Sequence, residues 1–152
     1  MARAWARAAA VVLAVVVVDQ VSKAIVRDQI PRGDRRGVIP AVDLVDVRNR
    51  GIAFGLLDGR SVVLTVLVAA ALGLLLFYFA LHSTRPLLWL ATGLLLGGAL
   101  GNLLVRLRDD AVTDFIDLPL WPAFNLADVS ITAGVLVLLA ALEMGREDAR
   151  AP

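Results

Sequence analysis

The sequence contains no cysteine, a single histidine and almost no surplus of either charge, with 15 Lys and Arg against 14 Asp and Glu in 152 residues. The lack of cysteine excludes disulfides, thiolate metal sites and a cysteine nucleophile. One histidine, His82, does not supply a histidine metal site by itself, so it is interpreted as a surface residue, and neither a metal nor a cofactor is expected. The balanced charge gives no basic surface, so nucleic acid is not an expected partner.

Apolar residues are abundant instead, at 59% of the chain with a mean hydropathy of +0.80. A helix that crosses a bilayer needs roughly 20 apolar residues, and four segments qualify: residues 5–26, 61–81, 86–105 and 124–142. The first segment ends in D-Q-V-S-K rather than in a small-residue cleavage site, so it is interpreted as a retained span. The chain is therefore predicted to be a mostly α-helical membrane protein, with one membrane domain over residues 1–152 and four transmembrane helices surrounded by membrane lipids.

The connections between these spans are unequal in length. Four spans place the two long connections, residues 27–60 and 106–123, on one side of the membrane, and both termini and the short link 82–85 on the other. The face with the long connections carries nine arginines and the face with the termini carries five. Because positive charge usually gathers on the cytoplasmic side, this count weakly disfavours cytoplasmic termini and does not settle the orientation.

The polar residues inside the spans gather toward the side with the long connections. At about 1.5 Å per helical residue, Asp19 lies roughly 10 Å before the end of the first span, and Asp128 lies roughly 6 Å into the fourth. Asp19 and Lys23 are spaced i, i+4 and can pair on one helix face. The same edge also holds Asn102, Arg106 and Asn125. Ionisable residues at membrane depth are candidates for a functional site.

Two segments of the long connections have the alternating, β-branched character of strands: V-D-L-V-D-V-R-N at residues 42–49 and V-T-D-F-I-D-L at residues 112–118. Unpaired backbone is not tolerated in hydrocarbon, so these segments are expected to pair into a small sheet at the membrane surface, beside the helix ends. Asp114 would then lie on a strand near the mouth of the helix bundle.

Two aspartates in a partly dry site would share one proton, because like charges close together do not both ionise cheaply. Such a pair can deprotonate a water and protonate a carbonyl or a leaving amine, which is peptide hydrolysis without a metal or a covalent intermediate. From spacing alone, the candidates are Asp19, Asp114, Asp117 and Asp128. A small proton-coupled membrane transporter is the alternative, although its acids would lie nearer the midplane and its loops would be shorter.

Four stretches resemble the motifs of the lipoprotein signal peptidases, or signal peptidase II: D-Q-V-S-K at 19–23, N-R-G-I-A-F-G at 49–55, G-G-A-L-G-N-L-L-V-R at 97–106 with V-T-D-F-I-D at 112–117, and F-N-L-A-D at 124–128. They follow the family order, and the four predicted spans lie in matching places. This resemblance implies a bacterial aspartic intramembrane peptidase. Such an enzyme cuts the signal peptide from a prolipoprotein on the amino side of a cysteine that carries diacylglycerol.

In this resemblance, the catalytic pair falls on Asp114 and Asp128. The other motif positions are expected to bind the substrate backbone, orient the pair or support the site: Asn49, Asn102, Arg106, Asn125, Asp19 and Lys23. The family also implies cytoplasmic termini, an active site toward the outer leaflet of the bacterial cytoplasmic (inner) membrane and a small extracytoplasmic sheet. The family inhibitor globomycin is expected to bind the aspartate pair.

One motif position departs from the family pattern, which usually has Asp where this chain has Val105. The missing carboxylate is expected to leave Arg106 without its usual partner, with Asp109 or Asp110 as nearby substitutes. The glycines of the same motif are interpreted as residues that let helices pack closely: Gly97, Gly98 and Gly101.

Overall fold

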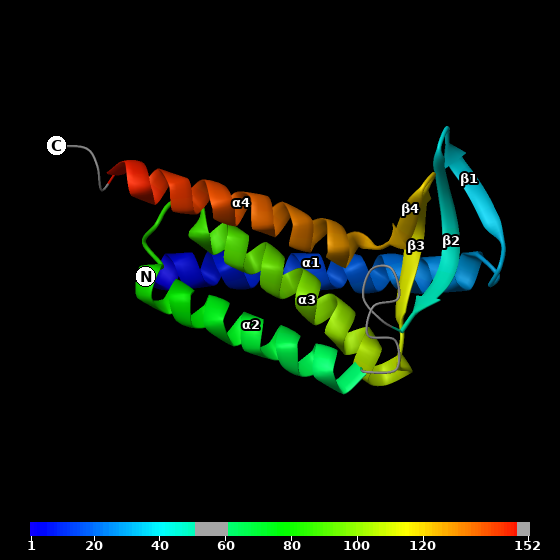
Figure 1. Ribbon diagram of the computed structural model, residues 1–152, viewed down its shortest axis with the longest axis horizontal. Helices are drawn as coiled ribbons and strands as arrows, with labels where there is room; N and C mark the ends of the chain where they lie inside the picture. Colours follow the sequence, from blue (N-terminus) through cyan, green and yellow to red (C-terminus); the bar gives the residue numbers. More distant parts are fainter. Residues whose placement is uncertain (51–60, 149–152) are drawn as a thin grey trace.

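The structure is a computed structural model that describes residues 1–50 and 61–148, without the side chains of residues 61–65 and 147–148. In this part of the chain, four helices run alongside one another, and a sheet lies across the end of the bundle that is remote from both termini (Figure 1). The helices are α1 (Ala2–Gln29), α2 (Ser61–His82), α3 (Leu88–Asp109) and α4 (Leu126–Asp148). Most of the motif N-R-G-I-A-F-G falls within residues 51–60, outside the described residues.

Three of the helices are long and apolar enough to cross a membrane by length and composition: Ala2–Gln29, Leu88–Asp109 and Leu126–Arg146. In α2, the apolar stretch among the described residues is shorter and covers Val66–His82. The mostly helical membrane fold with its small sheet is confirmed. That four helices cross the membrane stays a prediction.

The observed helix boundaries differ from those of the predicted spans. α1 continues to Gln29 and α3 to Asp109, because their polar ends stay helical beyond the apolar stretches. The third span was expected from residue 86, but α3 begins at Leu88. The predicted start of the fourth span at Phe124 is wrong, since Phe124 ends a strand and α4 begins two residues later, after a polar cap described below.

The sheet contains strands β1 (Arg35–Ile39), β2 (Val42–Asn49), β3 (Val112–Leu118) and β4 (Trp121–Phe124), in that order, with all neighbours antiparallel. β2 and β3 cover the two segments predicted as strands, and they pair although α2 and α3 separate them in the chain. β1 and β4 were not among the predicted strands. Each is joined to its neighbour by a short turn with one left-handed residue, Ala41 at φ 66° or Leu120 at φ 63°.

An apolar cluster fastens the sheet to the end of α1. Phe115 of β3 packs with Val26 of α1 and with Ile30, which follows that helix, and all three side chains are buried. Leu44 of β2 and Leu126 of α4 lie against the same cluster. Burying these side chains stabilises the junction by roughly 1.5–3 kcal/mol each. The sheet is therefore fixed relative to the bundle on the side where the polar residues gather.

Glycines of α3 allow close approach of its neighbouring helices. A Cβ atom on Gly97 would lie 2.7 Å from the Cβ of Val15 in α1, and one on Gly98 would lie 2.5 Å from the carbonyl oxygen of Ala127 in α4. Gly101 faces Asp19, whose Oδ2 would lie 2.7 Å from an added Cβ. These distances are below van der Waals contact, so the glycines serve the close packing expected from the sequence.

Replacing Gly98 with Ala is expected to force α3 and α4 apart and to lower the Tm of the detergent-solubilised protein by on the order of 5 °C, as overpacking in a tight core does. Gly73→Ala in α2 is the matched control, because an added Cβ there meets nothing within 4 Å in the described part of the chain. The control should keep or slightly raise the Tm, since alanine is the better helix former. Equal Tm values for the two variants would contradict this account of the packing.

Candidate functional site

Two acidic side chains meet where the sheet adjoins the bundle: Asp114 of β3 and Asp128 in the first turn of α4. Asp114 is buried, with 3% of its surface exposed, and Asp128 is half-buried. One residue contacts both carboxylates. The side-chain Nδ2 of Asn125 donates to Oδ1 of Asp114 at 2.6 Å, and its backbone N–H donates to Oδ2 of Asp128 at 3.1 Å. The two acids are 14 positions apart in the sequence, and in the fold both contact Asn125.

The position of Asn125 follows from the way α4 begins. Its Oδ1 accepts a hydrogen bond from the backbone N–H of Asp128 at 3.1 Å, while Asp128 accepts the backbone N–H of Asn125 in return. This reciprocal arrangement is a capping box, which satisfies two N–H groups that have no partner inside the helix. It uses Oδ1 of Asn125 for the cap and leaves Nδ2 for Asp114.

Asp114 receives a second hydrogen bond from Asn49 at the end of β2. The strand register pairs Val47 with Asp114 and Asn49 with Val112, so Asn49 is diagonal to Asp114 on the same face of the sheet. Its Nδ2 donates to Oδ2 of Asp114 at 2.8 Å. The predicted pairing of the two strand segments thus brings together two of the predicted site residues.

Burial raises the pKa of Asp114 to about 6, because removal from water disfavours the charged carboxylate. The nearby negative charge of Asp128 raises the pKa further. The hydrogen bonds from Asn49 and Asn125 and the positive charge of Lys23 act in the opposite direction, since they favour the carboxylate. Asp114 therefore exchanges its proton within reach of neutral pH, the range in which a general acid or base is effective.

The far side of Asp128 is connected to α1 through α3. Asn102 of α3 donates from Nδ2 to Oδ1 of Asp128 at 2.8 Å, and its Oδ1 accepts from Nζ of Lys23 at 2.7 Å. Lys23 also donates to Oδ2 of Asp19 at 2.8 Å, in a pair whose side chains are both fully buried. The i, i+4 pairing of Asp19 and Lys23 predicted from the sequence is confirmed.

Asp19 also contacts the start of α4 directly. Its Oδ1 accepts the backbone N–H of Ala127 at 3.0 Å, which gives a partner to another N–H group of the first turn. Gln20 was not among the predicted site residues, yet it donates from Nε2 to Asp19 at 3.0 Å and to the carbonyl of Gly101 at 2.9 Å. The sequence feature that could have identified Gln20 is its position in D-Q-V-S-K, next to Asp19 in an apolar helix.

Arg106 lies one helical turn after Asn102, is half-buried, and its positive charge acts on Asp114 and Asp128. Val105 beside it is buried, with 1% of its surface exposed. Asp109, named from the sequence as a substitute partner for Arg106, is bound by Arg108 at 2.8 Å and by Arg27 at 3.4 Å.

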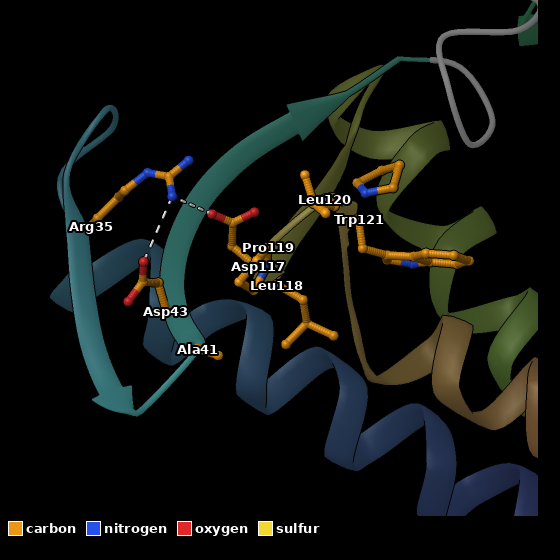
Figure 2. Close-up of a pocket in the computed structure, with 9 residues that line it drawn as sticks. Arg35, Ala41, Asp43, Asp117, Leu118, Pro119, Leu120 and Trp121 are labelled. Atoms are coloured by element: carbon orange, nitrogen blue, oxygen red, sulfur yellow. Dashed lines mark ion pairs between the residues drawn. The ribbon is translucent and has the colours of Figure 1, made fainter.

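Asp117, a candidate by spacing alone, lies outside this group. Its carboxylate pairs with Arg35 of β1 at 2.6 Å, and Arg35 also reaches Asp43 at 3.6 Å (Figure 2). These residues line a separate cavity of about 560 Å³ together with the exposed turn at Leu120 and Trp121. The fold therefore separates Asp117 from Asp114, although they are only three positions apart in the sequence.

Among the residues that the structure describes, no group of three or more His, Asp and Glu side chains is arranged to hold a metal ion. The described residues instead form a continuous series of hydrogen bonds, in which the backbone N–H of Asn125 makes the link to Asp128. It runs through Asp19, Lys23, Asn102, Asp128, Asn125, Asp114 and Asn49. Chemically, this arrangement offers two carboxyl groups held by N–H donors in a largely dry place, with Arg106 nearby.

A family model described as signal peptidase (SPase) II matches residues 11–144. A lipoprotein signal peptidase of Moorella thermoacetica is 45% identical over 142 residues, covering 89% of this chain and 95% of that protein. A lipoprotein signal peptidase of Halothermothrix orenii is 39% identical over 130 residues, covering 85% of this chain and 90% of that protein.

Two solved structures of bacterial membrane enzymes, determined by the in meso method, have a similar fold. One, at 2.3 Å resolution, superposes with a TM-score of 0.87 at 31% identity over 95% of this chain and 92% of that chain. The other, at 1.9 Å resolution, gives a TM-score of 0.81 at 33% identity over 89% and 91% of the two chains. From the family match and these relatives, the chain belongs to the signal peptidase II family of lipoprotein signal peptidases and is a membrane peptidase.

Proposed function

We propose that this peptidase is of the aspartic type and uses Asp114 and Asp128 as its catalytic pair. Its substrate is a prolipoprotein whose cysteine already carries diacylglycerol, and it cuts the peptide bond on the amino side of that cysteine. Membership of a peptidase family supports hydrolysis over the proton-coupled transporter that the intramembrane acids also suggested. The residues that hold the pair or the substrate backbone are Asn49, Asn102, Arg106 and Asn125. The site is further supported by Asp19 and Lys23.

The observation that carries this proposal is the double contact of Asn125. It binds Asp114 at 2.6 Å and Asp128 at 3.1 Å, so a carboxyl from the sheet and one from a helix are kept close together. Two carboxyls so placed share a proton, and the raised pKa of Asp114, about 6, is consistent with such sharing. The shared proton gives one acid and one base in the same site.

The hydrolysis follows from that arrangement. The ionised carboxyl takes a proton from a water molecule, whose oxygen attacks the carbonyl carbon of the scissile bond. The other carboxyl gives its proton to the carbonyl oxygen, so a tetrahedral diol forms. The proton taken from water then passes to the nitrogen of the leaving amine. As the C–N bond breaks, one hydroxyl of the diol returns its proton to the carboxylate that had protonated the carbonyl oxygen, which restores the pair. The products are a signal peptide with a new carboxylate and a diacylglyceryl cysteine with a free amino group.

We further propose that the termini lie in the cytoplasm and that the site faces the outer leaflet of the bacterial cytoplasmic membrane. Support comes from the arrangement in Figure 1, in which the sheet and the candidate site lie at the end of the bundle opposite both termini. A prolipoprotein that has crossed the membrane presents its lipidated cysteine at that leaflet. Globomycin, as an inhibitor of this family, is expected to bind at the aspartate pair.

Asp114→Asn and Asp128→Asn should each lower kcat by at least about 10³-fold, because each removes one of the two groups that move protons. The assay follows cleavage of a diacylglyceryl-modified prolipoprotein by the purified full chain in detergent micelles. Asp117→Asn is the matched control from the same strand as Asp114, since its carboxylate pairs with Arg35 outside the site. The control should keep its activity within about threefold. Normal cleavage by either Asp114→Asn or Asp128→Asn would refute the aspartic mechanism.

The raised pKa of Asp114 also predicts how stability depends on pH. Its pKa is about 6 in the fold against an ordinary 3.8, so the folded state holds the proton more tightly. The stabilising contribution of the protonated form is complete below about pH 4 and is lost as the pH rises through about 6. Over this range the free energy of unfolding falls by on the order of 3 kcal/mol. Between about pH 4 and 7.5, the Tm of the wild type should therefore fall relative to that of Asp114→Asn. Parallel curves for the two proteins would show that Asp114 titrates normally.

A further inference from the structure

Lys23 is a buried cation that the proposed hydrolysis does not use directly. Its side chain is fully buried, and Nζ lies 2.8 Å from Oδ2 of Asp19 and 2.7 Å from Oδ1 of Asn102. A buried ion pair adds little net stability compared with apolar side chains of the same volume, because both charges lose their water. The contact with Asn102 connects Lys23 to the candidate pair, since Asn102 is bound to Asp128.

The chemistry of the ammonium group fixes the orientation of that amide. An ammonium group has three N–H donors and no lone pair, so the atom of Asn102 that faces Lys23 has to be the oxygen. Nδ2 of Asn102 therefore faces Asp128, 2.8 Å from its Oδ1. The other oxygen of Asp128, Oδ2, also faces a group that can only donate. This group is the backbone N–H of Asn125, at 3.1 Å. Both oxygens of Asp128 thus accept hydrogen bonds from N–H groups.

We propose that Lys23 is a positioning residue for the reaction: by fixing the amide of Asn102, it keeps Oδ1 of Asp128 an unprotonated acceptor. The inference rests on the proposed function and specifies which oxygen of Asp128 stays without a proton. If Asn102 were turned, its oxygen would face an oxygen of Asp128, and that contact is favourable only when Asp128 carries the proton there. Lys23 excludes that state, so Oδ1 of Asp128 faces an N–H donor and does not hold the shared proton.

The first test compares two substitutions of Asn102, using the full chain and the diacylglyceryl prolipoprotein in micelles. Asn102→Ala removes the donor to Asp128 and should lower kcat by about 10²–10³-fold with KM within about threefold, as loss of one positioned donor does. Asn102→Asp keeps an oxygen for Lys23 but presents Asp128 with an acceptor that has no hydrogen. Its kcat should be at least about tenfold below that of the Ala variant. An Asp variant as active as the Ala variant, or more active, overturns the proposal, because it would mean that Asp128 donates to position 102.

The second test removes Lys23 without leaving an unpaired buried charge. The pair Asp19→Asn with Lys23→Met is neutral, and the Asn oxygen can still accept the N–H of Ala127 that Asp19 now accepts. Its kcat should fall about 10²-fold at nearly unchanged KM, with a Tm within about 5 °C of the wild type. Placed in the Asn102→Ala background, the same pair should lower kcat by no more than about threefold further, since Lys23 then has no amide to orient.

Two results of the second test would overturn the proposal: wild-type activity of the double variant, or losses that multiply independently in the triple variant. If the double variant does not fold, the comparison of Asn102→Asp with Asn102→Ala decides alone. Asp114→Asn and Asp128→Asn, assayed on the same substrate, separate this inference from the proposed function. Cleavage by either of them refutes the function, whereas their inactivity beside a fully active Lys23 double variant refutes only the role of Lys23.

Discussion

The carboxylate of Asp19 holds the site together from inside the bundle. The first N–H groups of a helix lack partners within it, and there is no water in a bilayer core to supply them. Asp19 binds one such group of α4, the N–H of Ala127 at 3.0 Å, and the positive end of the helix dipole favours the carboxylate there. Lys23 neutralises the same carboxylate at 2.8 Å. This contact connects α1 to the first turn of α4, the turn that also contains Asp128.

The same helix also positions the other half of the candidate pair. Beyond Lys23, α1 continues to Val26, which packs with Ile30 against Phe115, the residue next to Asp114 on β3. One helix thus holds α4 through a polar contact and the sheet through an apolar one. Because the packing of close-fitting apolar side chains leaves little freedom, the distance between the sheet and α4 is set by α1. Asn125 then makes the direct connection between the two acids.

The sequence was sufficient for the features that depend on local pattern. The strand segments 42–49 and 112–118 alternate, and they form β2 and β3 with the same bounds. β1 and β4 were not predicted, although Pro40 and Pro119 are turn signals, because Ala41 and Leu120 adopt the positive φ that Gly or Asn usually indicates after such a proline. The motif residues were recognised as a set, but the direction of each hydrogen bond depends on which donor faces which oxygen. The contact of Asn125 with both acids and the hydrogen bonds of Gln20 therefore depend on the tertiary structure and could not be predicted from the sequence.

The departure at Val105 is best understood through the charge of the whole site. Val105 has 1% of its surface exposed, so a carboxylate at that position would be buried, one residue before Arg106. The cluster already holds two cations, Lys23 and Arg106, against Asp19 and the single charge of a proposed pair that shares one proton. It is therefore electrically neutral with valine present, and an additional buried charge would need a further partner. Asp109, at the end of α3, is occupied by Arg108 and Arg27 in any case. Valine at this position is thus compatible with a pair that retains one proton, because the two cations are already balanced without a further acid.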